Sequence, residues 1–164
     1  MADYGFDGMI KVTWVPAIAN IASPTLAELT AGIDLEGRLT PDGLTTGAET
    51  AEVDSSKLNS VSNSAVPGRR SFSVGVKYVR GDDADALEVE AALIYGARGF
   101  LVVRRDKLAT IDYAAADNVE VYPAACRQPN PDAPAADTLQ AVDVPMTVTS
   151  EPKGYGDFAT VAAA

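Results

Sequence analysis

The chain has 164 residues, a length that favours one compact domain and that can bury about 70% of the surface of the unfolded chain. With 47% hydrophobic and 22% charged residues, it is too apolar to be wholly disordered. Its 13 Lys and Arg against 23 Asp and Glu give a formal net charge of -10, which argues against a sequence-reading nucleic-acid-binding protein. No apolar stretch reaches the about 18 residues of a membrane span, and the first residues lack the basic and apolar regions of a signal peptide. We therefore expect cytoplasmic synthesis without membrane insertion.

The acidic charge is unevenly distributed. Residues 1–66 carry 9 acids and 3 bases, residues 67–107 carry 6 and 8, and residues 108–164 carry 8 and 2. The locally basic middle third could pair with the acidic ends of other copies of the chain. The alternative is a set of ordinary solvated strand ends.

Apolar and polar residues alternate with a period of two along much of the chain, which predicts strands with one wet face. The predicted strands lie at about residues 9–14, 33–39, 71–78, 100–105, 118–124 and 142–149. Between 40 and 68 the sequence is rich in Ser, Thr and Gly without a clear period, and we interpret it as a long hairpin or arm with a weak strand around Val53 to Val61. The tail from Glu151 is expected to be flexible at its tip.

One helix is predicted from about Asp83 to Tyr95, with Asp82 or Asp83 as its cap and Gly96 at its end. Its main apolar stripe consists of Ala84, Leu87, Ala91, Ile94 and Tyr95, and Val89 and Leu93 widen the apolar face. Such a helix packs against its own sheet and could also contact a neighbouring subunit. A helix sunk only in its own core is the alternative.

The residues needed for common catalytic chemistry are missing from the sequence. Without histidine, and with Cys126 as the single cysteine, the chain cannot build a Ser-His-Asp or Cys-His arrangement, a histidine or four-thiolate zinc site or a thiolate-held iron-sulfur cluster. It also lacks a phosphate-binding loop and a dinucleotide fingerprint. The densest acidic group, Asp82, Asp83 and Asp85, lies where a helix N-terminus favours negative charge. We therefore expect no enzyme activity, cofactor or metal.

The segment from residue 14 to residue 39 has a distinctive order of parts. These are a strand ending at Trp14, a helical turn starting at Pro24-Thr25, the pair Glu28-Leu29, and then Gly32 and Asp34-Leu35 opening a second strand. In this order it resembles the N-terminal signature of the major tail tube proteins of long-tailed bacteriophages, especially those infecting actinobacteria. Pattern-level matches extend the resemblance through the acid-capped helix before Arg98–Arg104 to the closing strand at Val144–Thr149.

The resemblance implies a mainly β fold with one α-helix, in the form of an antiparallel β-sandwich or barrel. Six copies would form a ring with a continuous inner β-barrel, and rings would stack head to tail into a tail tube. The implied partners are other copies of the chain, a tape measure protein, a tail terminator and tail tip proteins. Double-stranded DNA would pass through the lumen without specific binding, and the protein would belong to the virion.

The alternating strands also supply candidates for the surfaces of such an assembly. The lumen-lining candidates are the polar positions Asp34, Glu36, Ser71, Ser73, Asp143 and Thr147. The inter-subunit candidates are Arg69, Arg70, Leu87, Arg104 and Arg105. An acidic lumen wall would repel phosphate and keep a duplex from sticking. The alternatives are another virion assembly protein, such as a tail terminator, decoration or head-tail joining protein, and a carboxylate-dependent hydrolase on a β-sandwich.

Overall fold

The computed structural model describes residue 3 and residues 5–163, and over these residues it contains nine strands and two helices. In chain order they are β1 (Lys11–Val15), α1 (Leu26–Thr30), β2 (Ile33–Asp34), β3 (Leu39–Asp54), β4 (Ala65–Val79), α2 (Ala84–Ala92), β5 (Arg98–Arg104), β6 (Asn118–Cys126), β7 (Asn130–Pro131), β8 (Ala141–Val148) and β9 (Ala159–Thr160). All strand pairs are antiparallel, so the expected mainly β antiparallel fold is confirmed. Two helices form instead of one.

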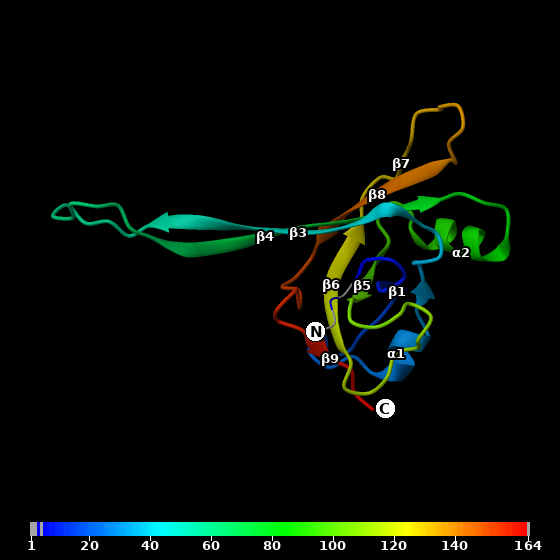
Figure 1. The fold of residues 1–164 in the computed structure, drawn as a ribbon, viewed down its shortest axis with the longest axis horizontal. Helices are drawn as coiled ribbons and strands as arrows, with labels where there is room; N and C mark the ends of the chain where they lie inside the picture. The colour runs from blue at the N-terminus through cyan, green and yellow to red at the C-terminus, as the bar shows by residue number, and fades with distance from the viewer. Residues whose placement is uncertain (1–2, 4, 164) are drawn as a thin grey trace.

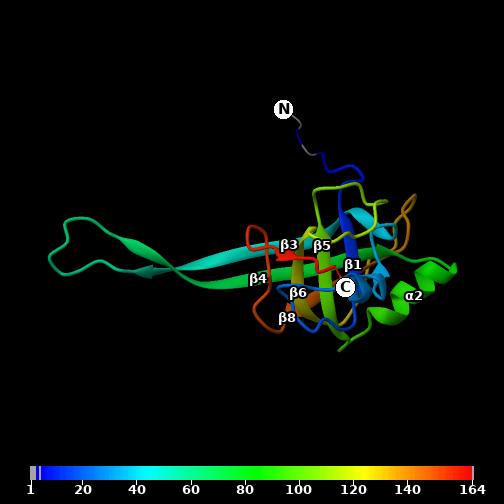
Figure 2. The ribbon, with the colours of Figure 1, turned by 90° about the horizontal axis from the view of Figure 1, so that it is seen from below.

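The main sheet has the order β2-β1-β5-β6-β8-β4-β3 and folds over on itself (Figures 1 and 2). The sheet bends between β6 and β8, which pair only over Ala124–Cys126 and Met146–Val148. As a result, the half made of β1, β5 and β6 faces the half made of β8 and β4 across the main core. Trp14 and Leu101 from the first half are buried with Val76 and Val144 from the second. Helix α2 adds Val89 and Leu93 to this core.

A second apolar cluster covers the opposite side of β5 and β6. It joins Val102 and Val121 to Leu29 of α1 and to Ala159 and Val161 near the C-terminus. Because β5 and β6 are buried on both faces, their apolar residues lie on both faces; β6 also carries the buried Glu120, which accepts a hydrogen bond from Arg105. The C-terminal segment also pairs with β6 through β9, which differs from the expected flexible tail.

The segment between β1 and β3 folds as it does for local reasons. Thr25 caps α1 in a capping box, since its hydroxyl accepts from the Glu28 N–H at 3.2 Å and Glu28 accepts from the Thr25 N–H at 2.9 Å. After the helix, the chain returns so close to β1 that a Cβ on Gly32 would lie 2.6 Å from Thr13. Glycine therefore permits β2 to pair with β1.

Helix α2 is shorter than predicted, and the face that it buries is not the predicted main stripe. Asp83 is the N-cap, and the helix ends at Ala92. Ala86, Val89 and Leu93 are buried. The predicted main stripe is exposed instead: Ala84, Leu87, Ala91, Ile94 and Tyr95 all face outward. Both sides of the helix are apolar, so periodicity alone does not identify the buried one.

Residues 40–68 contribute to a long two-stranded hairpin that projects from the body (Figure 1). Pairing runs from Leu39 with Tyr78 at the base to Asp54 with Ala65 at the far end. We call residues 49–71 the arm and residues 55–64 the arm tip. The predicted weak strand at Val53 to Val61 is wrong, because the ladder ends at Asp54 and the tip is a turn.

Candidate assembly surfaces

One polar face extends across β3, β4 and β8, on the side away from the main core. Val74 of β4 and Val144 of β8 point into the core. Successive side chains of a strand alternate between its two faces, so the neighbours of Val74 and Val144 in their own strands point away from the core. Gly75 lies opposite both Thr45 and Pro145, and Lys77 lies opposite Asp143, which fixes the register of this face. We call it the outer sheet face; its members are Thr45, Gly47, Glu49, Ser71, Ser73, Gly75, Lys77, Asp143, Pro145 and Thr147.

The structure brings four of the six lumen candidates together on this face. Ser71, Ser73, Asp143 and Thr147 are all exposed there. Glu49, which the sequence analysis did not single out, lies directly opposite Ser71. Continuing the strand alternation from Thr45 through Gly47 would have placed Glu49 on this face. The Gly- and Thr-rich composition of the segment hid that it forms a strand.

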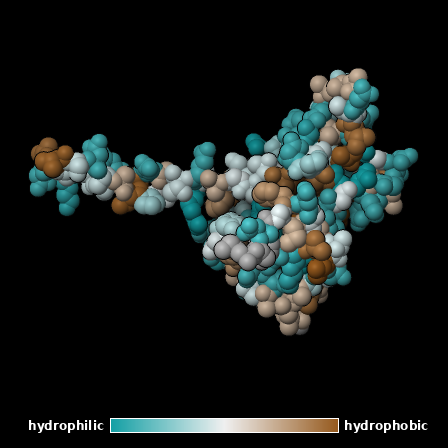
Figure 3. All heavy atoms as spheres, in the orientation of Figure 1, coloured by the Kyte–Doolittle hydropathy of each residue, from teal (hydrophilic) through white to brown (hydrophobic). Residues whose placement is uncertain are grey.

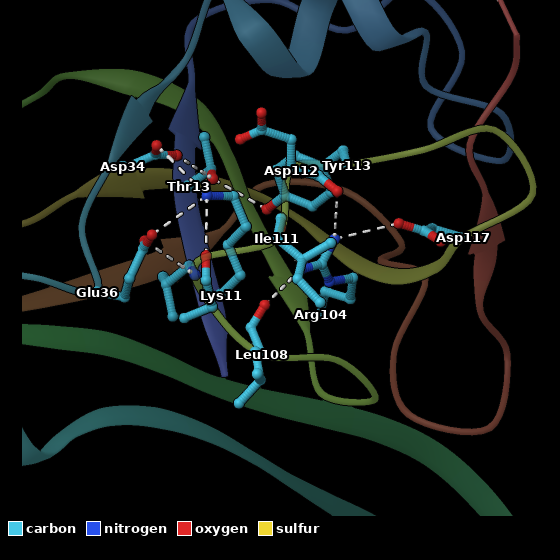
Figure 4. A network of polar contacts seen from close by, with 12 residues as sticks. Lys11, Thr13, Asp34, Glu36, Arg104, Leu108, Ile111, Asp112, Tyr113 and Asp117 are labelled. Carbon is cyan, nitrogen blue, oxygen red and sulfur yellow. Dashed lines mark hydrogen bonds and ion pairs between the residues drawn. The ribbon is translucent and has the colours of Figure 1, made fainter. Parts of the chain in front are cut away.

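Asp34 and Glu36 do not belong to the outer sheet face. They lie at the other end of the sheet, in and just after β2, and both contact Lys11 (Figure 4). The Lys11 Nζ lies 3.4 Å from Asp34 and 3.2 Å from Glu36, and the Thr13 hydroxyl donates to Asp34 at 3.0 Å. Since Lys11 is buried, these carboxylates neutralise a charge of their own chain.

The outer edge of β3 has no strand partner among the described residues. β3 is last in the strand order and pairs only with β4 there. An unpaired edge of this length is a template for pairing with a further strand. It borders the outer sheet face directly, so a second copy joined at this edge would extend that face.

Arg104 cannot contact another subunit, so its assignment as an inter-subunit residue is wrong. Its side chain is 0% exposed and points into the protein (Figure 4). It donates to the Asp117 carboxylate at 3.1 Å and to the backbone carbonyls of Leu108, Ile111 and Asp112. The pair Arg104-Arg105 resembles a solvated strand end, but alternation places the two side chains on opposite faces of the sheet, and both have partners within the chain.

Asp117 is the acidic centre of this buried network. Burial opposes its ionisation, but hydrogen bonds from Lys107, from the Ala114 N–H and from Arg104 outweigh burial and lower its pKa. The Tyr113 hydroxyl lies 2.9 Å from that of Thr13, and burial raises the Tyr113 pKa. The network therefore fixes the connection between β5 and β6 against β1.

The other basic candidates have partners of different kinds. The Arg105 Nε donates to the buried Glu120 at 2.5 Å, and its Nη2 donates to Thr46 at the base of β3 at 2.8 Å. Arg70 donates to Glu151 at 2.6 Å, in an exposed pair. Arg69 is exposed on the arm. Arg105, which directly follows β5, thus connects this strand end to β6 and β3 within one chain.

The outward stripe of α2 is an exposed apolar surface, with Leu87 53% and Tyr95 73% exposed. We expect Leu87→Asp to leave the free energy of unfolding within about 0.5 kcal/mol of wild type, because the side chain is already solvated. If the stripe contacts a neighbour, the same change should reduce self-assembly, measured by sedimentation. Leu93→Asp, on the buried face, is the matched control and should destabilise the fold by several kcal/mol. Normal assembly of Leu87→Asp would show that the stripe is not an interface.

The described residues contain no group of three or more His, Cys, Asp or Glu side chains placed to hold a metal ion. No helix among them is long and apolar enough to cross a membrane. Cys126 is buried, and burial raises its pKa to about 11, so its thiol is a poor nucleophile at neutral pH.

A projecting hairpin, an unpaired strand edge and a continuous polar sheet face are typical of a structural subunit. Comparison with known proteins identifies its class. A family model described as phage tail tube protein matches residues 1–164. The chain therefore belongs to the phage tail tube protein family and is a structural component of the phage tail and virion.

The fold is also similar to that of a solved chain. That chain comes from a cryo-EM structure of the anti-feeding prophage (AFP) baseplate, 6-fold symmetrised. The two share a TM-score of 0.53 over 95% of this chain and 99% of the other, at 12% sequence identity. No curated protein sequence matches the chain.

Proposed function

We propose that six copies of this chain form a ring, that rings stack head to tail into the tail tube, and that the outer sheet face lines the lumen. The observation that carries the proposal is the continuity of this polar face up to the unpaired edge of β3. Joining that edge to a second copy would continue one sheet around a ring and leave no exposed edge. The family and the likeness to a chain of a six-fold symmetrised assembly support a ring of six.

The lumen would be crossed by double-stranded DNA without specific binding. On the outer sheet face Glu49 and Asp143 are acidic, and Lys77 is paired with Asp132 at 2.7 Å. Most of the remaining members are glycines or hydroxyl residues, and the exposed Arg127 borders the face beside Asp143 and Pro145. With Asp132, three carboxylates therefore lie against two cations on this surface. A wall of this kind does not hold a polyanion.

The role of the chain in this proposal is structural and not catalytic. A tape measure protein, a tail terminator and tail tip proteins would be its partners, and synthesis and assembly would take place in the host cytoplasm. The arm would connect one ring to the next, because it extends well beyond the body of its own subunit (Figure 2).

Removal of the arm tests this assignment. Glu49 and Ser71 are paired in register, so residues 50–70 can be replaced by a two-residue Asn-Gly hairpin turn. The excised residues are almost all exposed, so we expect the variant to melt as the wild type does. It should form isolated rings and no tubes in negative-stain electron microscopy.

Excision of Thr45–Glu52 is a less suitable test, because Thr45 and Thr46 pair with β4 within the body. The matched control replaces only the exposed Asn59 and Ser62 with Lys and should keep tube formation. Tubes of normal length from the armless variant would contradict stacking through the arm, and a wild-type protein that never makes rings would contradict the proposed function.

A further inference from the structure

We infer that the arm tip of one copy docks, through Leu58 and Val61, in an apolar hollow between β1 and β3 of another copy. The inference rests on the proposed function, since it names the two surfaces that join successive rings. Both surfaces belong to this chain, so the occupant of the hollow is a second copy.

The arm tip displays two apolar side chains in the most exposed position of the molecule. Leu58 is 107% and Val61 105% exposed, and the end of the arm is brown in Figure 3. Leucine and valine in water at the end of a slender hairpin contribute nothing to the fold of their own copy. A contiguous exposed apolar site of this kind marks an interaction surface.

The arm tip is also a structured turn. The Ser55 N–H donates to the Ser64 carbonyl at 2.9 Å, the Ser64 N–H donates to the Ser56 hydroxyl at 2.8 Å, and the Ser60 N–H donates to the Lys57 carbonyl at 2.8 Å. These bonds hold the loop that carries Leu58 and Val61. A pre-ordered loop loses less conformational entropy on docking than a flexible one does.

The receiving surface is a hollow of about 390 Å³ beside the base of β3. We call it the β1–β3 hollow; its apolar lining is Phe6, Ile10, Val12, Leu39, Pro41, Leu44 and Ala109. Asp7 and Glu36 also line it, and Lys11 neutralises Glu36. The hollow is therefore apolar within and acidic at Asp7.

Position and charge match the two surfaces to each other. The arm tip follows the end of β3 at Asp54, whereas the hollow lies at the other end of the same strand, near Leu39. Two different surfaces at opposite ends of one element are what head-to-tail stacking requires. The only charged residue of the arm tip is Lys57, which complements Asp7 of the hollow.

Two complementary variants test the docking. The tip variant carries Leu58→Asp and Val61→Asp. The hollow variant carries Gly37→Arg, at an exposed lining position where an added Cβ meets nothing within 4 Å. Each should raise the critical concentration for tube formation about a hundredfold or more, because it removes or blocks two apolar contacts.

Mixing the two variants gives the decisive result. The tip variant keeps an intact hollow and the hollow variant keeps an intact tip, so one interface forms between them and growth then stops. We expect pairs of rings, and nothing longer, in sedimentation velocity and electron microscopy. The charge control Asn59→Lys with Ser62→Lys, whose added charges do not oppose Asp7, and the neighbouring surface control Thr110→Arg should both form normal tubes.

The outcomes separate the docking from the proposed function. Normal tubes from either docking variant, no association in the mixture, or loss of tubes in the charge control would overturn the docking. If the wild-type protein forms no tubes, the proposed function fails. In that case the mixture still tests the docking, because the two variants should form a 1:1 complex that neither forms alone.

Discussion

Asp117→Asn is expected to lower the free energy of unfolding at neutral pH by about 3–5 kcal/mol, because it leaves the buried Arg104 guanidinium without its carboxylate. For a chain of this size that corresponds to a fall in melting temperature of about 10 °C or more. Urea unfolding at pH 7 measures the change. The effect is large because Arg104 and Asp117 are both buried, unlike the exposed ion pairs at the surface.

The same variant has a defined pH signature. The Asp117 pKa is lowered in the folded protein, so its contribution is present above the ordinary value of 3.8 and is lost as the pH falls through the folded pKa. The difference in stability between wild type and Asp117→Asn should therefore narrow below about pH 3.8. Asp112→Asn, at an exposed side chain of the same loop, is the control and should change little. A difference that stays constant down to pH 2 would show that ionisation of Asp117 is not the cause.

Reversing the charge of the outer sheet face is expected to slow DNA ejection about tenfold or more at low salt. Glu49→Lys with Asp143→Lys changes about four charge units per copy, or about twenty-four in a ring of six. The lumen surface would then attract the DNA phosphates and retard the duplex. Added salt should relieve the defect, since screening shortens the range of the attraction. The rate of ejection from purified particles at two salt concentrations measures both effects. Lys77 lies opposite Asp143, so the variant loses up to about 1 kcal/mol of stability.

The control for this experiment reverses the same amount of charge elsewhere. Asp112 and Asp157 are exposed and lie outside the outer sheet face, so changing both to Lys should leave ejection normal. Asp34 and Glu36 are unsuitable targets, because their removal would leave the buried Lys11 unpaired. Wild-type ejection rates from particles that carry Lys at 49 and 143 would refute the lumen assignment.

Local signals in the sequence predicted β1, β5, β6, β8, the body part of β4 and the cap of α2, because these signals act over a few residues. The alternation in β4 and β8 identified the outward positions Ser73, Asp143 and Thr147, and of the two predicted caps, Asp82 or Asp83, the structure uses Asp83. These features depend on backbone geometry and on the two-residue periodicity of a strand. No long-range contact is needed to infer them.

The remaining errors have a common physical origin in contacts between distant residues. Leu87 and Val89 are both apolar, and only the position of the sheet decides that Val89 is buried. Arg104 is buried because Asp117 and three carbonyls, all later in the chain, surround its guanidinium. The arm had a weak strand signal because both of its faces are wet, which removes the apolar alternation that marks ordinary strands.

The burial of Cys126 has a practical consequence for labelling. With a pKa of about 11, only about one thiol in ten thousand is ionised at pH 7, and the side chain is enclosed in the core. A cysteine introduced at an exposed arm position outside the tip, such as Thr50, would then be the one maleimide-reactive group of each copy. A fluorophore there would report single-molecule distances between successive arms without removal of the native cysteine.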